Sequence, residues 1–215
     1  MKNFIKKVTN RFRLTEDKLT AESIFTDWVE IDQYDISCEY PKIKLENIDF
    51  DFDKDSVLII DDNEGMVSFL EDDIEFLAEH NLINQHKINI LGISGDHAAF
   101  TFKTLQDEYG SLNIKWAIID ITLGGSKMTE KGNLKYSGVD VFKMIYDKNP
   151  DVKFLFYTGN SLNPYINANK NLIAQFKSIN GDDIMSHVLF KTSMDMDKRR
   201  KYISKILFGE SILYG

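Results

Sequence analysis

The sequence contains a single cysteine, Cys38, among its 215 residues. One cysteine cannot form a disulfide within the chain, and such sparse use is typical of a reducing compartment, so we expect a cytoplasmic protein. No apolar run approaches the length of about 20 residues that a membrane-spanning helix needs. The N-terminus also lacks the apolar core of a secretory signal peptide.

A net positive charge is missing as well. The chain has 26 Lys and Arg residues against 34 Asp and Glu residues, which gives a formal net charge of −8. Proteins that bind nucleic acids usually present a basic face, so we expect no nucleic acid partner. Basic residues do gather in residues 1–13, where apolar residues recur at helical spacing. Such a segment can lie on a membrane, but we favour a terminal helix packed on its own domain.

Several common catalytic motifs are absent. The sequence has no phosphate-binding G-x-x-x-x-G-K-[ST] element, no G-x-G-x-x-G element and no serine or cysteine nucleophile elbow. Its four histidines show no metal-ligand spacing. These absences argue against the nucleotide-binding, hydrolase and zinc functions that depend on those motifs.

From residue 56 onward, short apolar runs alternate with amphipathic segments. Buried parallel strands read as short apolar runs, and their alternation with helices indicates β–α units. Five such units predict an α/β fold: a flavodoxin-like, doubly wound, five-stranded parallel sheet of order 2-1-3-4-5. The predicted strands are 57–61, 88–93, 115–120, 153–158 and 187–191, and the predicted helices are about 64–80, 96–108, 138–148 and 195–208, with an Asn-rich helical stretch after residue 158.

The first 55 residues carry no motif but have the patterns of a folded segment. We expect short helices at residues 1–13 and 15–29, followed by half-buried strands in which Ile48, Phe50 and Phe52 alternate with polar residues. We therefore divide the chain into an N-terminal α+β extension of unknown role, residues 1–55, and a second unit, residues 56–215.

Five polar residues stand at the ends of the apolar runs: Asp61 and Asp62, Asp120, Thr158, and Lys191. In an open α/β sheet the carboxyl ends of the strands meet at one edge, where ligands bind. Three neighbouring carboxylates repel one another unless a cation neutralises them, and Mg²⁺ suits carboxylate, carbonyl and water oxygens. Together with a hydroxyl and an ammonium group, they describe a site for a divalent cation and a phosphoryl group.

At these positions the sequence resembles the receiver domain of two-component response regulators. The segments that carry the resemblance are Ile60-Asp61-Asp62-Asn63, Ile119-Asp120, Tyr157-Thr158-Gly159 and Phe190-Lys191. Each is weak alone, but all four occur in the family's order and each stands at a predicted strand end. The resemblance covers about residues 56–208.

The resemblance implies a role for each acid. Asp120 would be the phospho-acceptor. Asp62 would bind Mg²⁺ directly together with Asp120, whereas Asp61 would act through water. The backbone carbonyl of Thr122 would complete the protein ligands.

The resemblance also implies what surrounds the acceptor. Lys191 would pair with Asp120 and then with the phosphoryl group, and Thr158 would move to capture that group. Gly159 would remove side-chain bulk beside the site. The phosphoryl donor would be a histidine kinase or a histidine phosphotransfer protein, and the output would pass to an unknown protein partner. Catalysis would be limited to self-phosphorylation and slow autodephosphorylation.

The sequence departs from the family pattern in four places, one of which is the stretch from Asn160 to Asp183, longer than the family norm. Thr192 follows Lys191 where the family usually has proline, and Val188 stands where the family usually has a switching aromatic residue. A Gly- and Lys-rich insertion, residues 124–133, separates the acceptor from the next predicted helix. This insertion either gates the site or selects a partner, or it is a tolerated surface loop; the sequence leaves the functional and the neutral reading open.

Two other functions remain as alternatives. A receiver-like interaction module would keep the fold without phosphorylation. An aspartate-dependent phosphatase would use a similar sheet, but such enzymes need a second aspartate two residues after the nucleophile, and Asp120 is followed by Ile121-Thr122. With fewer than ten residues after the last predicted helix, we expect no DNA-binding output domain there.

Overall fold

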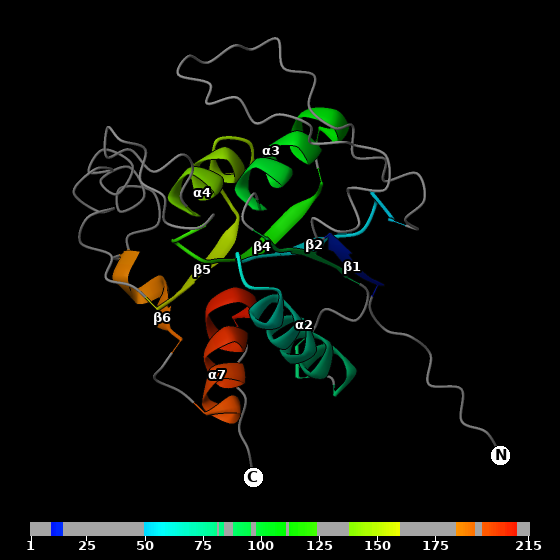
Figure 1. Cartoon of the computed structure of the whole chain (residues 1–215). Coiled ribbons are helices and arrows are strands. Elements are labelled where there is room, and N and C mark those ends of the chain that lie inside the picture. Colours follow the sequence, from blue (N-terminus) through cyan, green and yellow to red (C-terminus); the bar gives the residue numbers. More distant parts are fainter. Residues whose placement is uncertain are drawn as a thin grey trace, which may run out of the picture.

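The computed structural model describes residues 10–14, 50–80, 82–83, 88–95, 98–110, 112–123, 138–159, 184–191 and 195–209. They form one parallel sheet with helices on both faces (Figure 1). The order across the sheet is β1-β3-β2-β4-β5-β6. The strands are β1 (Asn10–Leu14), β2 (Ser56–Ile60), β3 (Asn89–Ile93), β4 (Ile114–Ile119), β5 (Lys153–Thr158) and β6 (Val188–Phe190).

The last five strands confirm the predicted fold class. Their order, β3-β2-β4-β5-β6, is the predicted 2-1-3-4-5 arrangement, and every pair is parallel. The predicted boundaries agree with these strands to within about one residue because each apolar run is buried along nearly its whole length.

The predicted helix at residues 1–13 is wrong over its last four residues. Residues 10–14 form β1, which pairs in parallel with β3 and places Asn10 opposite Asn89. The run from Arg11 to Leu14 alternates charged and apolar residues, so it also fits the period of a strand, and the edge of β3 offers backbone groups for pairing. Residues 1–9 and the predicted helix at 15–29 lie outside the described residues.

The predicted strand that ends near Phe52 is also wrong where it can be compared. Phe50 and Asp51 are irregular, and a turn begins at Phe52. The rest of that predicted strand lies outside the described residues, as does the Asn-rich stretch after residue 159. Since β1 belongs to the sheet of the second unit, part of the extension completes that sheet; the division at residue 55 stays a prediction.

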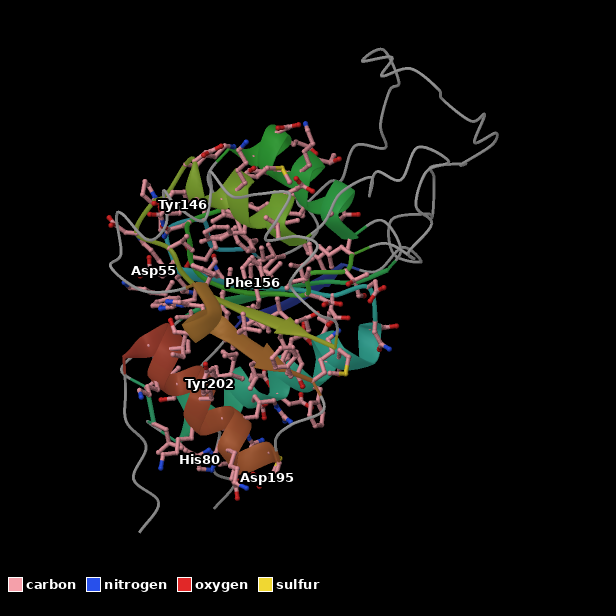
Figure 2. The ribbon with its side chains drawn as sticks, turned by 90° about the vertical axis from the view of Figure 1, so that its left-hand side faces the viewer. Asp55, His80, Tyr146, Phe156, Asp195 and Tyr202 are labelled. Carbon is pink, nitrogen blue, oxygen red and sulfur yellow. The ribbon has the colours of Figure 1, made fainter. Side chains whose placement is uncertain are left out.

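The helices form a layer on each side of the sheet. The helices α3 (Ala98–Tyr109) and α4 (Gly138–Tyr146) cover one face, and α2 (Glu64–Glu79) and α7 (Met196–Ile203) cover the other (Figure 1). Figure 2 shows the same layers through Tyr146 of α4, Phe156 of β5 and Tyr202 of α7. A π-helical turn, η3 (Ser204–Phe208), continues α7, and a 3₁₀ turn, η2 (Ile184–His187), precedes β6. These helices confirm the four predicted ones.

Alternation along the strands builds two cores. Leu58 and Ile60 of β2 pack into the cluster shared with α3 and α4, whereas Val57 and Ile59 pack into the cluster shared with α2 and α7. All four side chains are buried, so β2 is the centre of the molecule. Among the described residues, no helix has the length and apolar character to cross a membrane.

Candidate functional site

The backbone carries the two buried aspartates past the ends of their strands in register. The amide of Asp61 donates to the carbonyl of Ile93 at 3.2 Å, and the amide of Asp120 donates to the carbonyl of Ile60 at 2.8 Å. Both residues therefore extend the sheet's hydrogen bonding by one step beyond β2 and β4. Because β2 and β4 are neighbours, their end residues lie side by side.

Three carboxylates meet at this edge, as the sequence predicts. Asp61, Asp62 and Asp120 each offer one oxygen, and these oxygens all lie within 4.8 Å of one another. Asp61 and Asp120 are buried and Asp62 is partly exposed. Oδ1 of Asp61 also accepts a hydrogen bond from the amide of Asn63 at 3.0 Å, and Asn63 caps the N-terminus of α2. The start of α2 thus fixes the orientation of Asp61.

Lys191 brings a cation to the same cluster. Its Nζ lies 2.8 Å from Oδ2 of Asp61 and 2.9 Å from Oδ2 of Asp120. Its side chain is 20 % exposed, so the ammonium group is largely shielded from water. The amide of Lys191 donates to the carbonyl of Thr158 at 3.0 Å, which ties the end of β6 to the end of β5.

Burial and charge shift the ionisation of all three partners. Burial raises the pKa of Asp61 to about 6, with a further rise from Asp120, although Lys191 opposes the shift. Burial likewise raises the pKa of Asp120 against the effect of Lys191. Burial works to lower the pKa of Lys191, but its bonds to Asp61 and Asp120 outweigh burial and raise that pKa. The ammonium stays charged, and the site has more negative charge than one cation neutralises.

The donor set fits a hard divalent cation. It consists of carboxylate oxygens, which Mg²⁺ prefers. Oδ1 of Asp120 is buried and has no hydrogen-bond partner of ordinary geometry among the described residues, although the nearby backbone of Thr122 acts to lower the pKa of this carboxyl. A buried polar atom of this kind is costly unless a partner satisfies it. A bound cation would satisfy it and relieve the repulsion among the acids.

The two threonines are at the predicted edge. Thr158 is the last residue of β5 and is fully buried, and Thr122 lies two residues beyond Asp120 and is partly buried. Their predicted contacts, a hydroxyl bond to a phosphoryl group and a carbonyl bond to a metal, stay predictions.

Sequence reasoning missed the glycine that supports the acceptor. A Cβ atom on Gly138 would lie 1.9 Å from the backbone oxygen of Asp120, so the first residue of α4 must be glycine for the two backbones to approach. The amide of Gly138 also donates to the carbonyl of Ile121 at 2.8 Å. The sequence feature that could have indicated this role is the position of Gly138 at the start of a predicted helix.

The expectation for Gly159 is corrected by the same measurement. A Cβ atom there would meet no atom of the described residues within 4 Å, so the described residues leave room for a side chain at this position. The position follows β5 and is exposed.

No protein-family model matches the chain, and no curated protein matches its sequence. Solved structures do resemble it. The RcsB response regulator of Salmonella typhimurium has 16% identity and a TM-score of 0.41 over 74% of this chain and 62% of its own. The activated DrrB receiver domain has 11% identity and a TM-score of 0.40 over 71% and 97%. A CheY-like receiver domain protein from Methanospirillum hungatei has 16% identity and a TM-score of 0.41 over 71% and 92%.

The chain thus spans 62% of the length of the RcsB structure and nearly all of the single receiver domains. All three are response regulators or receiver domains. A further structure of RcsB is a complex with DNA.

Proposed function

We propose that the protein is a divergent response-regulator receiver that accepts a phosphoryl group on Asp120 in a Mg²⁺-dependent reaction. One observation supports this above all: a buried aspartate touches an ammonium group inside a cluster of three carboxylates, at the carboxyl edge of a doubly wound sheet. Sites of this composition perform phosphoryl transfer mainly by positioning and charge stabilisation.

The transfer is a displacement at phosphorus. A carboxylate oxygen of Asp120 forms a bond to the phosphorus of a phosphohistidine, and the P–N bond breaks. The histidine nitrogen leaves with the bonding electron pair, and Asp120 becomes an acyl phosphate. Lys191 is already within 2.9 Å of the acceptor carboxylate, so its charge is in place for the incoming phosphoryl oxygens.

The metal ligands follow from the same cluster. Asp62 and Asp120 would bind Mg²⁺ directly, Asp61 would act through water, and the backbone carbonyl of Thr122 would complete the protein ligands. When bound, the ion supplies positive charge to the phosphoryl oxygens. The amide of Asn63 and the ammonium group of Lys191 hold the carboxylate of Asp61 in place beside the proposed Mg²⁺ site.

Phosphorylation would act as a switch on protein contacts. It adds nearly two negative charges to a small buried site. Converting a population of one per cent to ninety-nine requires about 5.5 kcal/mol of differential interaction. A hydrogen bond from Thr158 to the phosphoryl group supplies about 1.5–3 kcal/mol. Repacking of loops and helices therefore has to supply the rest.

The surrounding pathway is part of the proposal. The donor is a histidine kinase or a histidine phosphotransfer protein of the cytoplasm. The output is a change in contact with another protein, without direct binding of nucleic acid, in line with the acidic net charge of −8.

Incubation with acetyl phosphate and Mg²⁺ tests the function directly. Intact-mass spectrometry should show one added phosphate on the wild-type protein, none without Mg²⁺, and none on Asp120→Asn. Asp107→Asn, which changes an exposed acid of α3, is the matched control and should keep the adduct. A wild-type protein with no adduct would refute phosphoryl acceptance.

One observation favours the alternative of an interaction module without phosphorylation. Val188 begins β6, is buried, and pairs with Phe156, so no aromatic switch occupies that position. If the protein is such a module, the Asp120→Asn variant should bind the partner as well as the wild type does. The other alternative, an aspartate-dependent phosphatase, is disfavoured because Thr122 stands where that chemistry needs an aspartate. Repeated turnover of a small phosphate ester would show phosphatase activity.

A further inference from the structure

A second charge cluster lies between α2 and α7, away from the three carboxylates. Asp73 of α2 is buried and contacts two arginines of α7. Nε of Arg199 lies 2.5 Å from Oδ2 of Asp73, and Nε of Arg200 lies 2.7 Å from Oδ1. Both arginines are at least nine-tenths buried. One carboxylate thus holds two guanidinium groups, with one oxygen for each.

Aromatic rings of α2 complete the contact. The guanidinium of Arg199 lies 4.0 Å from the ring centre of Phe69, and that of Arg200 lies 3.8 Å from the ring centre of Phe76. Phe69, Asp73 and Phe76 have the spacing i, i+4, i+7, so they form one stripe along α2. We call these five residues the α2–α7 clamp.

The clamp contributes to the packing of α7. Of the eight residues of α7, only Arg199, Arg200 and Ile203 are buried. Ile203 and the half-buried Tyr202 pack in the apolar cluster on this face of the sheet, as do the residues of η3 that follow. Two of the three buried residues of α7 are charged, so Asp73 helps to set the position of α7. Figure 1 shows α2 and α7 side by side on the same face of the sheet.

These two helices follow the two halves of the candidate site. The helix α2 starts directly after Asp61 and Asp62, and its capping residue Asn63 donates to Asp61. The helix α7 starts at Met196, five positions after Lys191. The hydroxyl of Tyr202 in α7 lies 3.5 Å from the carbonyl oxygen of Val188 in β6, so α7 also contacts the strand that precedes Lys191.

The strand before Lys191, β6, is short. It has three residues, stands at the edge of the sheet, and pairs with β5 alone among the described strands. Tyr157 of β5 lies near the ammonium group: Nζ of Lys191 lies 6.0 Å from its ring centre. Burial raises the pKa of the Tyr157 phenol, and the charges of Arg199 and Lys191 oppose that rise.

We propose that Asp73 is a positioning residue for Lys191: by holding α7 against α2 through Arg199 and Arg200, it keeps the ammonium group between Asp61 and Asp120. The proposal rests on the proposed function only for its phosphorylation readout. Asp73 thus has a role in the site although it touches none of the reacting groups.

Asp73→Asn tests the proposal, because it preserves shape and removes the charge. Displacing a reacting group by about 1 Å costs on the order of a hundredfold in rate. We expect the rate of phosphorylation by acetyl phosphate to fall about tenfold to a hundredfold, with Mg²⁺ affinity changed less than about threefold, because all three carboxylates remain. Asp72→Asn, the exposed neighbour on α2, is the matched control and should match the wild type.

Two readouts separate positioning from a general loss of stability. First, Asp73→Asn should lower the rate no further in a Lys191→Met background; losses that multiply would overturn the proposal. Second, the Lys191 amide should exchange faster with solvent, and the ¹⁵Nζ signal of its ammonium should shift. If the folded variant keeps both signals unchanged, the proposal is wrong.

Two further outcomes are a variant that does not fold and a wild-type protein that accepts no phosphate. If Asp73→Asn does not fold, Arg199→Lys replaces it, since this change keeps the charge but loses the fork geometry and the stacking on Phe69. The same two signals are expected to change. If the wild-type protein accepts no phosphate, the proposed function fails, whereas the amide and ammonium signals of Lys191 still decide the positioning role.

Discussion

The ammonium nitrogen of Lys191 lies 2.9 Å from Oδ2 of Asp120, although 71 positions separate the two residues in the chain. The contact exists because β4 and β6 flank β5 in a parallel sheet, so their ends meet at one edge. The same nitrogen lies 2.8 Å from Asp61. The ammonium group of Lys191 therefore links both buried acids.

Replacing Lys191 with methionine should destabilise the protein in the absence of Mg²⁺. The change leaves Asp61 and Asp120 buried without their cation, and removing one partner of a buried ion pair costs about 3 kcal/mol or more. We expect the free energy of unfolding in urea to fall by about that amount, and saturating Mg²⁺ to restore much of it. Lys198→Met, which breaks an exposed pair with Asp195, should leave the midpoint unchanged. Equal midpoints for the two variants would count against a structural role for the Lys191 pair.

The raised pKa of Asp61 predicts a pH dependence of stability with a definite sign. Its folded-state pKa is about 6, above the ordinary value of 3.8, so the folded protein holds a proton that the unfolded chain has lost. The stabilisation from this proton is fully present below about pH 4 and is lost as the pH rises through about 6. The stability of wild type minus that of Asp61→Asn, measured by urea unfolding without metal, should therefore fall across this window. A difference that rises with pH would show that Asp61 has a lowered pKa.

Magnesium binding should have the opposite pH dependence. The ion needs the ionised carboxylate, so protons compete with it below about pH 6, and binding should release protons there. We expect isothermal titration calorimetry to show weaker Mg²⁺ affinity near pH 5 than near pH 7, on the order of tenfold. Buffers that differ in ionisation enthalpy would count the released protons. An affinity independent of pH would indicate that Mg²⁺ does not engage the buried acids.

Gly138→Ala should disturb the acceptor itself. The new Cβ would lie 1.9 Å from the backbone oxygen of Asp120, and neither backbone is free to yield. Overpacking of this kind costs about 1–3 kcal/mol or more. We expect a lower unfolding midpoint together with shifted amide signals at Asp120 and Ile121. Gly159→Ala is the control, because a Cβ there meets no atom of the described residues within 4 Å; if both variants behave alike, the close approach is not what selects glycine at position 138.

The sheet could be predicted from the sequence because each strand is marked by a pattern within a few consecutive residues. Each central strand contains a run of four buried apolar residues, and a polar residue directly follows each run. The position of a residue at a strand end then determines that it reaches the common edge. Asp61, Asp120 and Lys191 could be placed together on this basis, before any contact was known.

The remaining features depend on contacts that leave no local pattern. Residues 10–14 fit helical and strand periods equally well over so short a length, and pairing with β3 decides between them. Phe69 is a large apolar residue, yet it is 45% exposed and its ring lies against the guanidinium of Arg199. Asp73 and Arg199 are 126 positions apart, and a charged residue on a helix normally indicates a solvated face. Only the packing of α7 on α2 reveals them as buried partners.

Thr158→Ala separates binding of the metal from capture of the phosphoryl group. The residue ends β5, is fully buried, and accepts the amide of Lys191 through its backbone carbonyl, which the substitution keeps. In the proposed phosphorylated state its hydroxyl donates to a phosphoryl oxygen, a bond worth about 1.5–3 kcal/mol. We expect unchanged Mg²⁺ affinity, and a smaller gain in unfolding free energy on phosphorylation than in the wild type, by about that amount. Thr158→Ser retains the hydroxyl and should behave like the wild type. If the alanine and serine variants gain equally on phosphorylation, the hydroxyl does not contact the phosphoryl group, and the stabilisation comes from Lys191 and the metal ligands alone.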